Sequence, residues 1–254
     1  MPQNDQDLSQ ITSPDLEERI KTGKASKIIL PVGSLEQHGP HLPLNTDTAI
    51  GDYVAKRVSE KCPHAFLMPA IPLGCSTEHL GFAGTISLQP ETMLRIILEI
   101  STSLLQSGIR KLFIINGHGG NRAALEIAMI NTKHVLPEMQ LYSFTILDIA
   151  KERFAQVRKS SKGLVGHADE IETSMMLAIK PEAVDMSKAV LAEPSLPGSL
   201  SFEPEDLSMV SFSWNTKDLS KIGVIGDPRH AAAETGRTLL DFTVEKIATM
   251  INEL

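Results

Sequence analysis

The sequence is short of several features that would define a protein class at once. It has two cysteines in 254 residues, Cys62 and Cys75, so it cannot build a disulfide framework, and this usage fits a reducing compartment. Aromatic residues make up 4% of the chain. No apolar run approaches the roughly 18 residues that a membrane span requires, and the N-terminal segment lacks the apolar core of a signal peptide. These absences predict a cytoplasmic protein that does not enter a membrane.

Basic residues are also fewer than acidic residues. Lysine and arginine number 24 against 31 aspartates and glutamates, which gives a net charge of −7 at pH 7. A non-specific nucleic-acid binder needs a basic face to neutralise phosphates, so we expect no nucleic-acid partner and no attraction to an anionic membrane surface. What is present is a globular composition, 42% hydrophobic and 22% charged. Such a chain buries roughly 70–75% of its unfolded surface, and we expect one domain over residues 1–254.

Short apolar runs alternate with longer helical patterns along the chain. We expect strands over residues 27–32, 65–69, 111–115 and 141–147. We expect helices over residues 49–62, 90–106, 121–134, 169–179 and about 228–252. Residues 190–221 mix proline, serine and acidic residues with aromatics, and we expect an irregular but packed insertion there. The alternation predicts the α/β class, with a mainly parallel β-sheet flanked by helices on both faces.

The first polar segment, GSLEQHGPHLPLNTD (33–47), follows the first expected strand, at the sheet edge where α/β proteins bind ligands. Glu36 and His38 are two residues apart, so their side chains point the same way in an extended backbone. Carboxylate and imidazole are a ligand mix that zinc, manganese and ferrous iron accept. With Asp47, the segment predicts a metal site. The alternative is that Asp47 or Thr46 only caps the next helix and the histidines lie on the surface.

Three further polar segments are expected near the same edge. NGHGGN (116–121) places His118 among glycines that let the backbone approach a ligand; a phosphate cradle or a plain tight turn is the alternative. GHADEIETS (166–174) begins a helix, whose dipole accounts for Asp169 and Glu170 but not for His167. Glu172 precedes an apolar run, so we expect it to face inward, where a carboxylate needs a partner such as a metal.

The fourth segment, GCSTEHLGFAGT (74–85), follows the second expected strand. It offers Ser76, Glu78 and His79 as candidates for a pocket wall, and a solvated loop is the alternative. Together the four segments bring ligand-rich loops to the edge where an α/β sheet places its active site.

Taken in order, these segments, followed by GVIGDPRHAAAETG (223–236), resemble the creatininase (creatinine amidohydrolase) family over nearly the whole chain. The resemblance implies an α/β homohexamer that hydrolyses amide bonds at a two-metal site. It implies two divalent ions per chain, which we expect to be zinc, manganese or iron. The implied metal ligands are Glu36, His38, His118 and a bridging Asp47. His167 matches the position at which the family places a catalytic histidine.

The sequence departs from the creatinine-opening members of the family at two neighbouring positions. Those members carry a glutamate two residues after the histidine of NGH, where this chain has Gly120, so Glu172 is the expected substitute ligand. They also carry tryptophans and a tyrosine around the substrate ring, whereas this chain has one tryptophan, Trp214, and Gly119 in place of the tyrosine. We therefore do not expect creatinine as the substrate. A cyclic amide, a formamide and a small peptide amide, the last through a mycofactocin-type peptidase, are the candidates.

The expected activity is hydrolysis of an amide-type C–N bond in a small-molecule substrate. Two ions about 3.5–4 Å apart lower the pKa of a bridging water, and the hydroxide attacks the carbonyl. His167 is the candidate general acid for the leaving nitrogen, and Glu170 orients it or relays the proton. Ser76, His79 and Gly119 are the candidate substrate contacts. The alternative class is a non-catalytic, metal-stabilised oligomeric scaffold. A serine hydrolase lacks support because no G-x-S-x-G motif is present.

Overall fold

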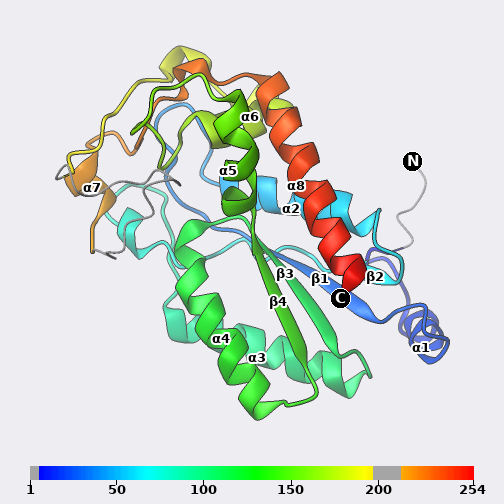
Figure 1. Cartoon of the computed structure of the whole chain (residues 1–254). Helices are drawn as coiled ribbons and strands as arrows, with labels where there is room; N and C mark the ends of the chain where they lie inside the picture. The colour runs from blue at the N-terminus through cyan, green and yellow to red at the C-terminus, as the bar shows by residue number, and fades with distance from the viewer. Residues whose placement is uncertain (1–5, 197–212) are drawn as a thin grey trace.

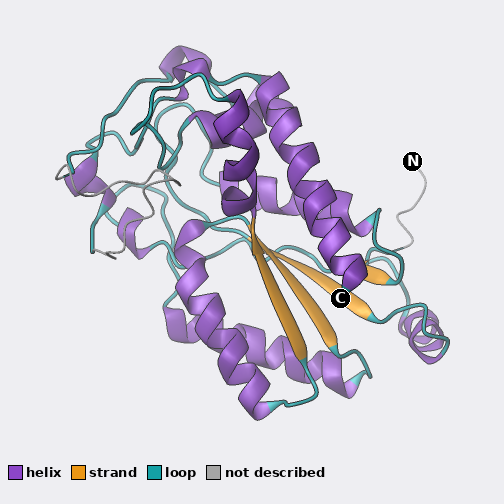
Figure 2. Ribbon diagram, in the orientation of Figure 1, coloured by secondary structure: helices purple, strands orange, loops and turns teal. Residues whose placement is uncertain are grey.

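The computed structural model describes residues 6–196 and 213–254, and a four-stranded parallel sheet lies at the centre of this part of the chain (Figures 1 and 2). The strands are β1 (Lys27–Val32), β2 (Ala65–Leu67), β3 (Lys111–Asn116) and β4 (Gln140–Thr145). Their order is β2-β1-β3-β4. Val32, Asn116 and Thr145 are in register across β1, β3 and β4. These three strands therefore end together at one edge of the sheet.

Helices cover both faces of the sheet. The helices are α1 (Ser13–Lys21), α2 (Thr46–Ser59), α3 (Pro90–Gln106), α4 (Arg122–Val135), α5 (Ile146–Val157), α6 (Glu170–Ile179), α7 (Thr216–Leu219) and α8 (Ala233–Glu253). Short 3-10 turns include η1 (Thr77–His79) and η2 (Gly119–Asn121). In Figure 1, α3 and α4 form the layer on one side of the strands, and α2, α5, α6 and α8 form the layer on the other. The predicted fold class is confirmed.

Consecutive strand residues supply two separate cores. On β3, Leu112 and Ile114 belong to the core that includes α3 and α4, whereas Phe113 and Ile115 belong to the core that includes α2 and α8. This period of two places neighbouring side chains on opposite faces of the sheet. Because both faces are buried, the inner strands β1 and β3 are apolar along most of their length, whereas β4, at the edge of the sheet, is mostly half-buried and carries polar residues. This burial explains why β1 and β3 appear in the sequence as apolar runs.

The connections between strands create a switch point. The chain leaves β1 through α2 to β2 on one side, and it leaves β3 through α4 to β4 on the other side. The connections that leave β1 and β3 therefore run in opposite directions, which opens a crevice outside the carboxyl ends of these two strands. Open α/β sheets bind ligands in such crevices.

Most expected elements agree with the structure to within a few residues, and the helix over 90–106 agrees at both ends because Pro90 and Gly108 delimit it. The expected strand over 141–147 is too long: β4 ends at Thr145, and α5 begins at Ile146 with no loop between them. We did not predict α1 or α5, nor the short α7 inside the expected insertion. The expected start of the last helix, near residue 228, is too early: α8 begins at Ala233, because Pro228–His230 is a 3-10 turn. Within the expected insertion, residues 197–212 lie outside the described residues.

No helix in the described part of the chain combines the length and the hydropathy that a membrane crossing demands.

The core assignment leads to a stability prediction. Ile114→Ala should lower the free energy of unfolding by about 2–5 kcal/mol, because the substitution leaves a cavity between β3 and the layer of α3 and α4. The matched control is Ile130→Ala on α4, where the isoleucine is 73% exposed, and its cost should be at most about 0.5 kcal/mol. Urea unfolding of both variants checks this. Equal losses of unfolding free energy in the two variants would contradict the assignment of Ile114 to the core.

Candidate metal centre and active site

The loops that follow β1, β2 and β3 meet in the crevice, and one buried amide joins them. Asn121 donates from Nδ2 to the Gly33 carbonyl at 3.0 Å and to Asn116 Oδ1 at 3.2 Å. Its Oδ1 accepts the Cys75 N–H at 2.8 Å. Gly33 follows β1, Cys75 lies in the loop after β2, and Asn116 ends β3. Asn121 therefore fixes the relative positions of all three loops.

Asp47, in the first turn of α2, lies at the centre of a cluster of potential metal ligands. Its Oδ2 is 2.9 Å from His118 Nδ1, and its Oδ1 is 3.1 Å from His38 Nε2. Glu36, Asp47 and His118 offer ligand atoms within 4.8 Å of one another, and so do His38, Asp47 and Glu172. Each oxygen of Asp47 thus faces a different group. Both groups comprise carboxylate oxygens and an imidazole nitrogen.

Glu172 reaches the cluster from α6. Its Oε2 lies 3.9 Å from His38 Nε2 and accepts the Ala168 N–H at 2.6 Å. Ala168 adopts a left-handed backbone with φ of 51°, a conformation that costs a non-glycine residue about 1–3 kcal/mol. Local backbone strain therefore accompanies the bend that places Glu172 against His38.

Backbone carbonyls orient the two imidazoles that face Asp47. His38 Nδ1 lies 3.2 Å from the Glu36 carbonyl oxygen, and His118 Nε2 lies 2.9 Å from the Cys75 carbonyl oxygen. A ring nitrogen that donates to a carbonyl leaves the other nitrogen free to bind a metal. Nε2 of His38 and Nδ1 of His118 are the atoms left free, and both are directed at Asp47.

The buried carboxylates make the cluster demand positive charge. Burial raises the pKa of Glu36 to about 7 and the pKa of Glu172 to about 8. Burial lowers the pKa of both His38 and His118, but the facing carboxylates outweigh it and raise each pKa to about 10. Burial also opposes ionisation of Asp47, yet these two histidines hold the pKa of Asp47 well below its usual range. Protons thus occupy the positions that a cation would take.

Glu36 supplies an independent sign that the cluster fits a metal. It is 0% exposed, and neither of its carboxylate oxygens accepts a hydrogen bond within the described residues. Its nearest imidazole neighbours are His118 Nε2 at 3.2 Å and His79 Nε2 at 3.3 Å, neither of which has hydrogen-bond geometry. A buried carboxylate in this state is costly unless a cation compensates it. The surrounding oxygen and nitrogen atoms suit zinc, manganese or iron. The residues therefore fit a divalent metal ion.

The remaining predicted site residues, with one exception, surround the same cluster. Ser76 Oγ lies 3.4 Å from His118 Nε2, and His79 Nε2 lies 3.3 Å from Glu36 Oε1. His167 Nδ1 lies 3.8 Å from the same Glu36 oxygen. Its ring is 4.2 Å from the ring of His79, centroid to centroid. Burial, followed by the charges of neighbouring histidines, lowers the pKa of His167 well below its usual range.

Glu170 is the exception. Its carboxylate accepts hydrogen bonds from the backbone N–H of Lys159 at 3.0 Å and of Ser160 at 2.7 Å. It therefore holds the loop before α6, and these contacts are not the expected ones to His167. Two acidic residues lie in the first turn of α6, and only Glu172 faces the cluster.

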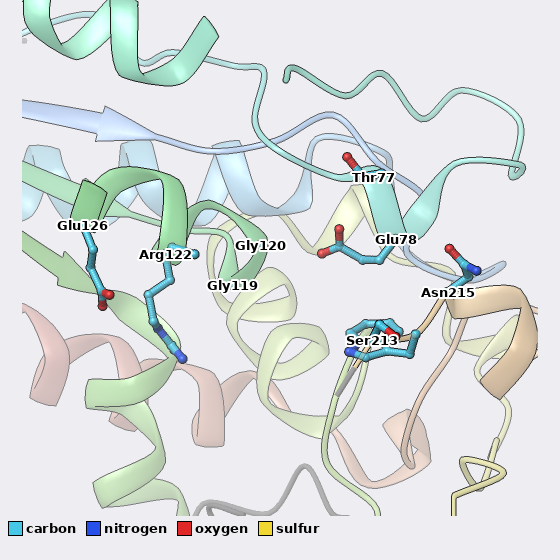
Figure 3. A pocket seen from close by; sticks show the side chains of 10 residues that line it. Thr77, Glu78, Gly119, Gly120, Arg122, Glu126, Ser213 and Asn215 are labelled. Atoms are coloured by element: carbon cyan, nitrogen blue, oxygen red, sulfur yellow. The ribbon is translucent and has the colours of Figure 1, made fainter. Parts of the chain in front are cut away.

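A pocket leads outward from the cluster, and Figure 3 shows the residues that line its outer part. Its inner part, about 240 Å³, is lined by residues that include His79, His118 and His167. Its outer part, about 620 Å³, is lined by Thr77, Glu78, Gly119, Gly120, Arg122, Ala123, Glu126, Ser213, Trp214 and Asn215. Glu78, Gly119, Gly120, Arg122 and Trp214 line both parts. The two volumes therefore form one path to the cluster.

Gly120 is required by the packing beside this path. A Cβ at position 120 would lie 2.4 Å from the Cys75 carbonyl oxygen and 2.6 Å from Glu78 Oε1. Gly119 is different, since a Cβ there meets no atom within 4 Å. Sequence reasoning did not identify Arg122, at the start of α4, or Lys151, within α5, as pocket residues, because a single cation on a helix gives no signal of its own.

Comparisons with known proteins agree with this geometry. The family model for creatininase (creatinine amidohydrolase) matches residues 9–251. A mycofactocin precursor peptide peptidase from Mycobacterium ulcerans (strain Agy99) is 35% identical over 235 residues, covering 88% of this chain and 84% of the relative. A creatinine amidohydrolase from Pseudomonas putida is 27% identical over 260 residues, covering 97% and 96%. A solved manganese form of creatininase, 26% identical, aligns over 98% of both chains with a TM-score of 0.81.

The chain therefore belongs to the creatininase family of amidohydrolases, and the resemblance seen in its motifs is confirmed.

The charge balance of the cluster leads to a prediction about protons. Zinc added to metal-free protein at about pH 7.5 should release about three protons per chain, because metal and protons compete for the same atoms. Two come from His38 and His118, whose pKa values are each raised to about 10. About one comes from Glu172 and Glu36, whose pKa values are raised to about 8 and about 7. Because zinc binding releases protons, zinc affinity should rise as the pH rises. Calorimetry in two buffers of different ionisation enthalpy counts the protons. Zinc binding with no buffer dependence would contradict the prediction.

Proposed function

We propose that this protein hydrolyses an amide-type C–N bond with two divalent ions per chain, zinc, manganese or iron. The observation that carries the proposal is Glu36, a fully buried carboxylate whose two oxygens accept no hydrogen bond in the described residues. It lies beside Asp47, which belongs to two ligand groups. Such an arrangement suits a pair of cations that share one carboxylate.

The six ligand positions divide between two ions. Glu36, Asp47 and His118 hold one, and His38, Asp47 and Glu172 hold the other. Glu172 takes the place of the carboxylate that the chain lacks at Gly120. This assignment is supported by the 3.9 Å between Glu172 Oε2 and His38 Nε2. When bound, divalent ions polarise the substrate carbonyl and make a water molecule a stronger acid.

Other side chains of the cluster handle the substrate and the proton. His167 takes a proton at Nδ1, the nitrogen 3.8 Å from Glu36 Oε1, and delivers it to the leaving nitrogen. Ser76 and His79 contact the amide from the side of the loop after β2. Gly119 lines the path along which the rest of the substrate extends.

The pocket favours an extended, peptide-type amide over a small ring. The outer part of the pocket has a volume of about 620 Å³, and Gly119 leaves it open. The 35% identity to a mycofactocin precursor peptide peptidase supports the same choice.

Two further proposals concern the whole protein. A homohexamer is proposed from the family resemblance. A cytoplasmic location is proposed because Cys62 and Cys75 are both free and buried, as is usual in a reducing compartment.

Metal content tests the function directly. Purified protein should hold about two ions per chain, Glu172→Gln about one, and Asp47→Asn fewer than one, because Asp47 serves both ions. Elemental analysis measures the content. The control is Glu182→Gln, an exposed carboxylate away from the pocket, which should keep the parent value. A parent that is metal-free and takes up neither zinc nor manganese would favour the non-catalytic scaffold instead.

The substrate path is tested by filling it. Gly119→Leu should lower kcat/KM for peptide amides by about 10-fold or more, because its side chain enters the space the substrate needs. Hydrolysis of a small formamide, which does not extend past position 119, should be unchanged. Gly119→Ala is the milder companion variant. Equal losses for the large and the small substrate would refute the proposed path.

A further inference from the structure

Gln37 is a buried residue at the centre of the site, and its side-chain amide contacts two of the site histidines. It is 6% exposed. Its Oε1 accepts the Gly39 N–H at 3.0 Å, which determines which end of the amide is the oxygen. Its Nε2 then faces one carbonyl oxygen and two ring nitrogens: the Gly223 carbonyl oxygen at 3.1 Å, His79 Nδ1 at 2.9 Å and His167 Nε2 at 3.0 Å.

The hydrogens available at this point can be assigned. An amide nitrogen has two hydrogens and no lone pair, and the Gly223 carbonyl takes one of them. His167 Nε2 also lies 2.8 Å from the backbone carbonyl oxygen of Gln37, which needs a donor. His167 therefore carries its hydrogen on Nε2 and cannot accept the second amide hydrogen. That hydrogen goes to His79 Nδ1, which is then unprotonated. The Thr216 hydroxyl, 2.8 Å from the same nitrogen, can donate as well as accept and is compatible with this form.

The two rings consequently present different hydrogen-bonding groups to the cluster: His79 presents a donor and His167 presents an acceptor. His79 carries its hydrogen on Nε2, the atom 3.3 Å from Glu36 Oε1. His167 presents the lone pair of Nδ1, 3.8 Å from the same oxygen. With ring centroids 4.2 Å apart, a donor and an acceptor stand side by side.

We propose that Gln37 is a positioning residue whose side-chain amide and backbone carbonyl set the tautomers of His79 and His167, so that one ring offers a donor and the other an acceptor to the substrate. Amide hydrolysis needs both: a donor for the carbonyl oxygen as it gains charge, and an acceptor for a proton of the attacking water. This catalytic consequence rests on the proposed function, whereas the tautomers do not.

Gly223 gives an independent way to move the amide. Its φ is +86°, and a Cβ there would lie 1.7 Å from Gln37 Oε1, so Gly223→Ala must displace the Gln37 side chain. Gly163 also has a φ of +86°, and a Cβ there meets nothing within 4 Å. Gly163→Ala therefore introduces similar backbone strain without touching Gln37. The two variants form a matched pair.

The test reads the tautomers in the zinc-loaded full chain with nitrogen-15-labelled histidine. Long-range proton–nitrogen correlation spectra distinguish the two neutral forms of each ring, and the signals are assigned by their loss in H79N and H167N. Both rings should be in the Nε2–H form in the parent. In Gln37→Met, His79 should shift toward the Nδ1–H form, because Thr216 Oγ1, 2.8 Å away, can accept that hydrogen.

His167 should keep its form in Gln37→Met, because the backbone carbonyl stays. Gly223→Ala should reproduce the change at His79, and Gly163→Ala should not. The proposal is overturned if His79 is already in the Nδ1–H form in the parent, or if it stays in the Nε2–H form in Gln37→Met.

Turnover and metal content complete the test. Gln37→Met and Gly223→Ala should lower kcat by about 10–100-fold, the usual cost of losing a partner that orients a site residue, with metal content unchanged. Gly163→Ala should keep the parent kcat. An unchanged kcat in Gln37→Met despite an altered His79 would overturn the positioning role. A metal-free parent would instead refute the proposed function, while the tautomers can still be read.

Discussion

The burial of three carboxylates at one point of the sheet edge is the constraint on which the rest of this site depends. Glu36, Asp47 and Glu172 are taken out of water together, and their mutual repulsion requires positive charge among them. Histidines at the same point meet that requirement with protons in the absence of a metal, which is why their pKa values rise despite burial. The electrostatics of the cluster thus fit a bound cation, independently of any resemblance to other proteins.

The fold supplies the rigidity that such a site needs. Parallel strands that end in register bring their loops to one place, and the reversal of direction between β1 and β3 leaves the crevice between them. Asn121 then joins three loops with a single side chain. The carboxylates are therefore held against their repulsion by backbone that is itself anchored in the sheet.

Much of this could be predicted from the sequence, because the main ligand candidates, such as Glu36 and His118, directly follow strands whose apolar runs are unmistakable. Helix α5 escaped prediction because it begins at once after β4, so the two apolar patterns merge. The choice between Glu170 and Glu172 depends on which carboxylate meets the backbone of residues 159–160, a tertiary contact. Gln37 was missed because it lies between two candidate ligands, and alternation would point it away from them.

The way the loops are joined bears on how the protein can evolve. The Asn121 amide anchors the backbone that carries His118, whereas Gly119, the next residue, has open space before it. A side chain could therefore appear or vanish at position 119 while the ligand cluster stays in place. Under the proposed function, substitution at position 119 would change which substrates fit while the metal ligands stay in place, which is one physical route by which a single scaffold can come to serve chemically different amides.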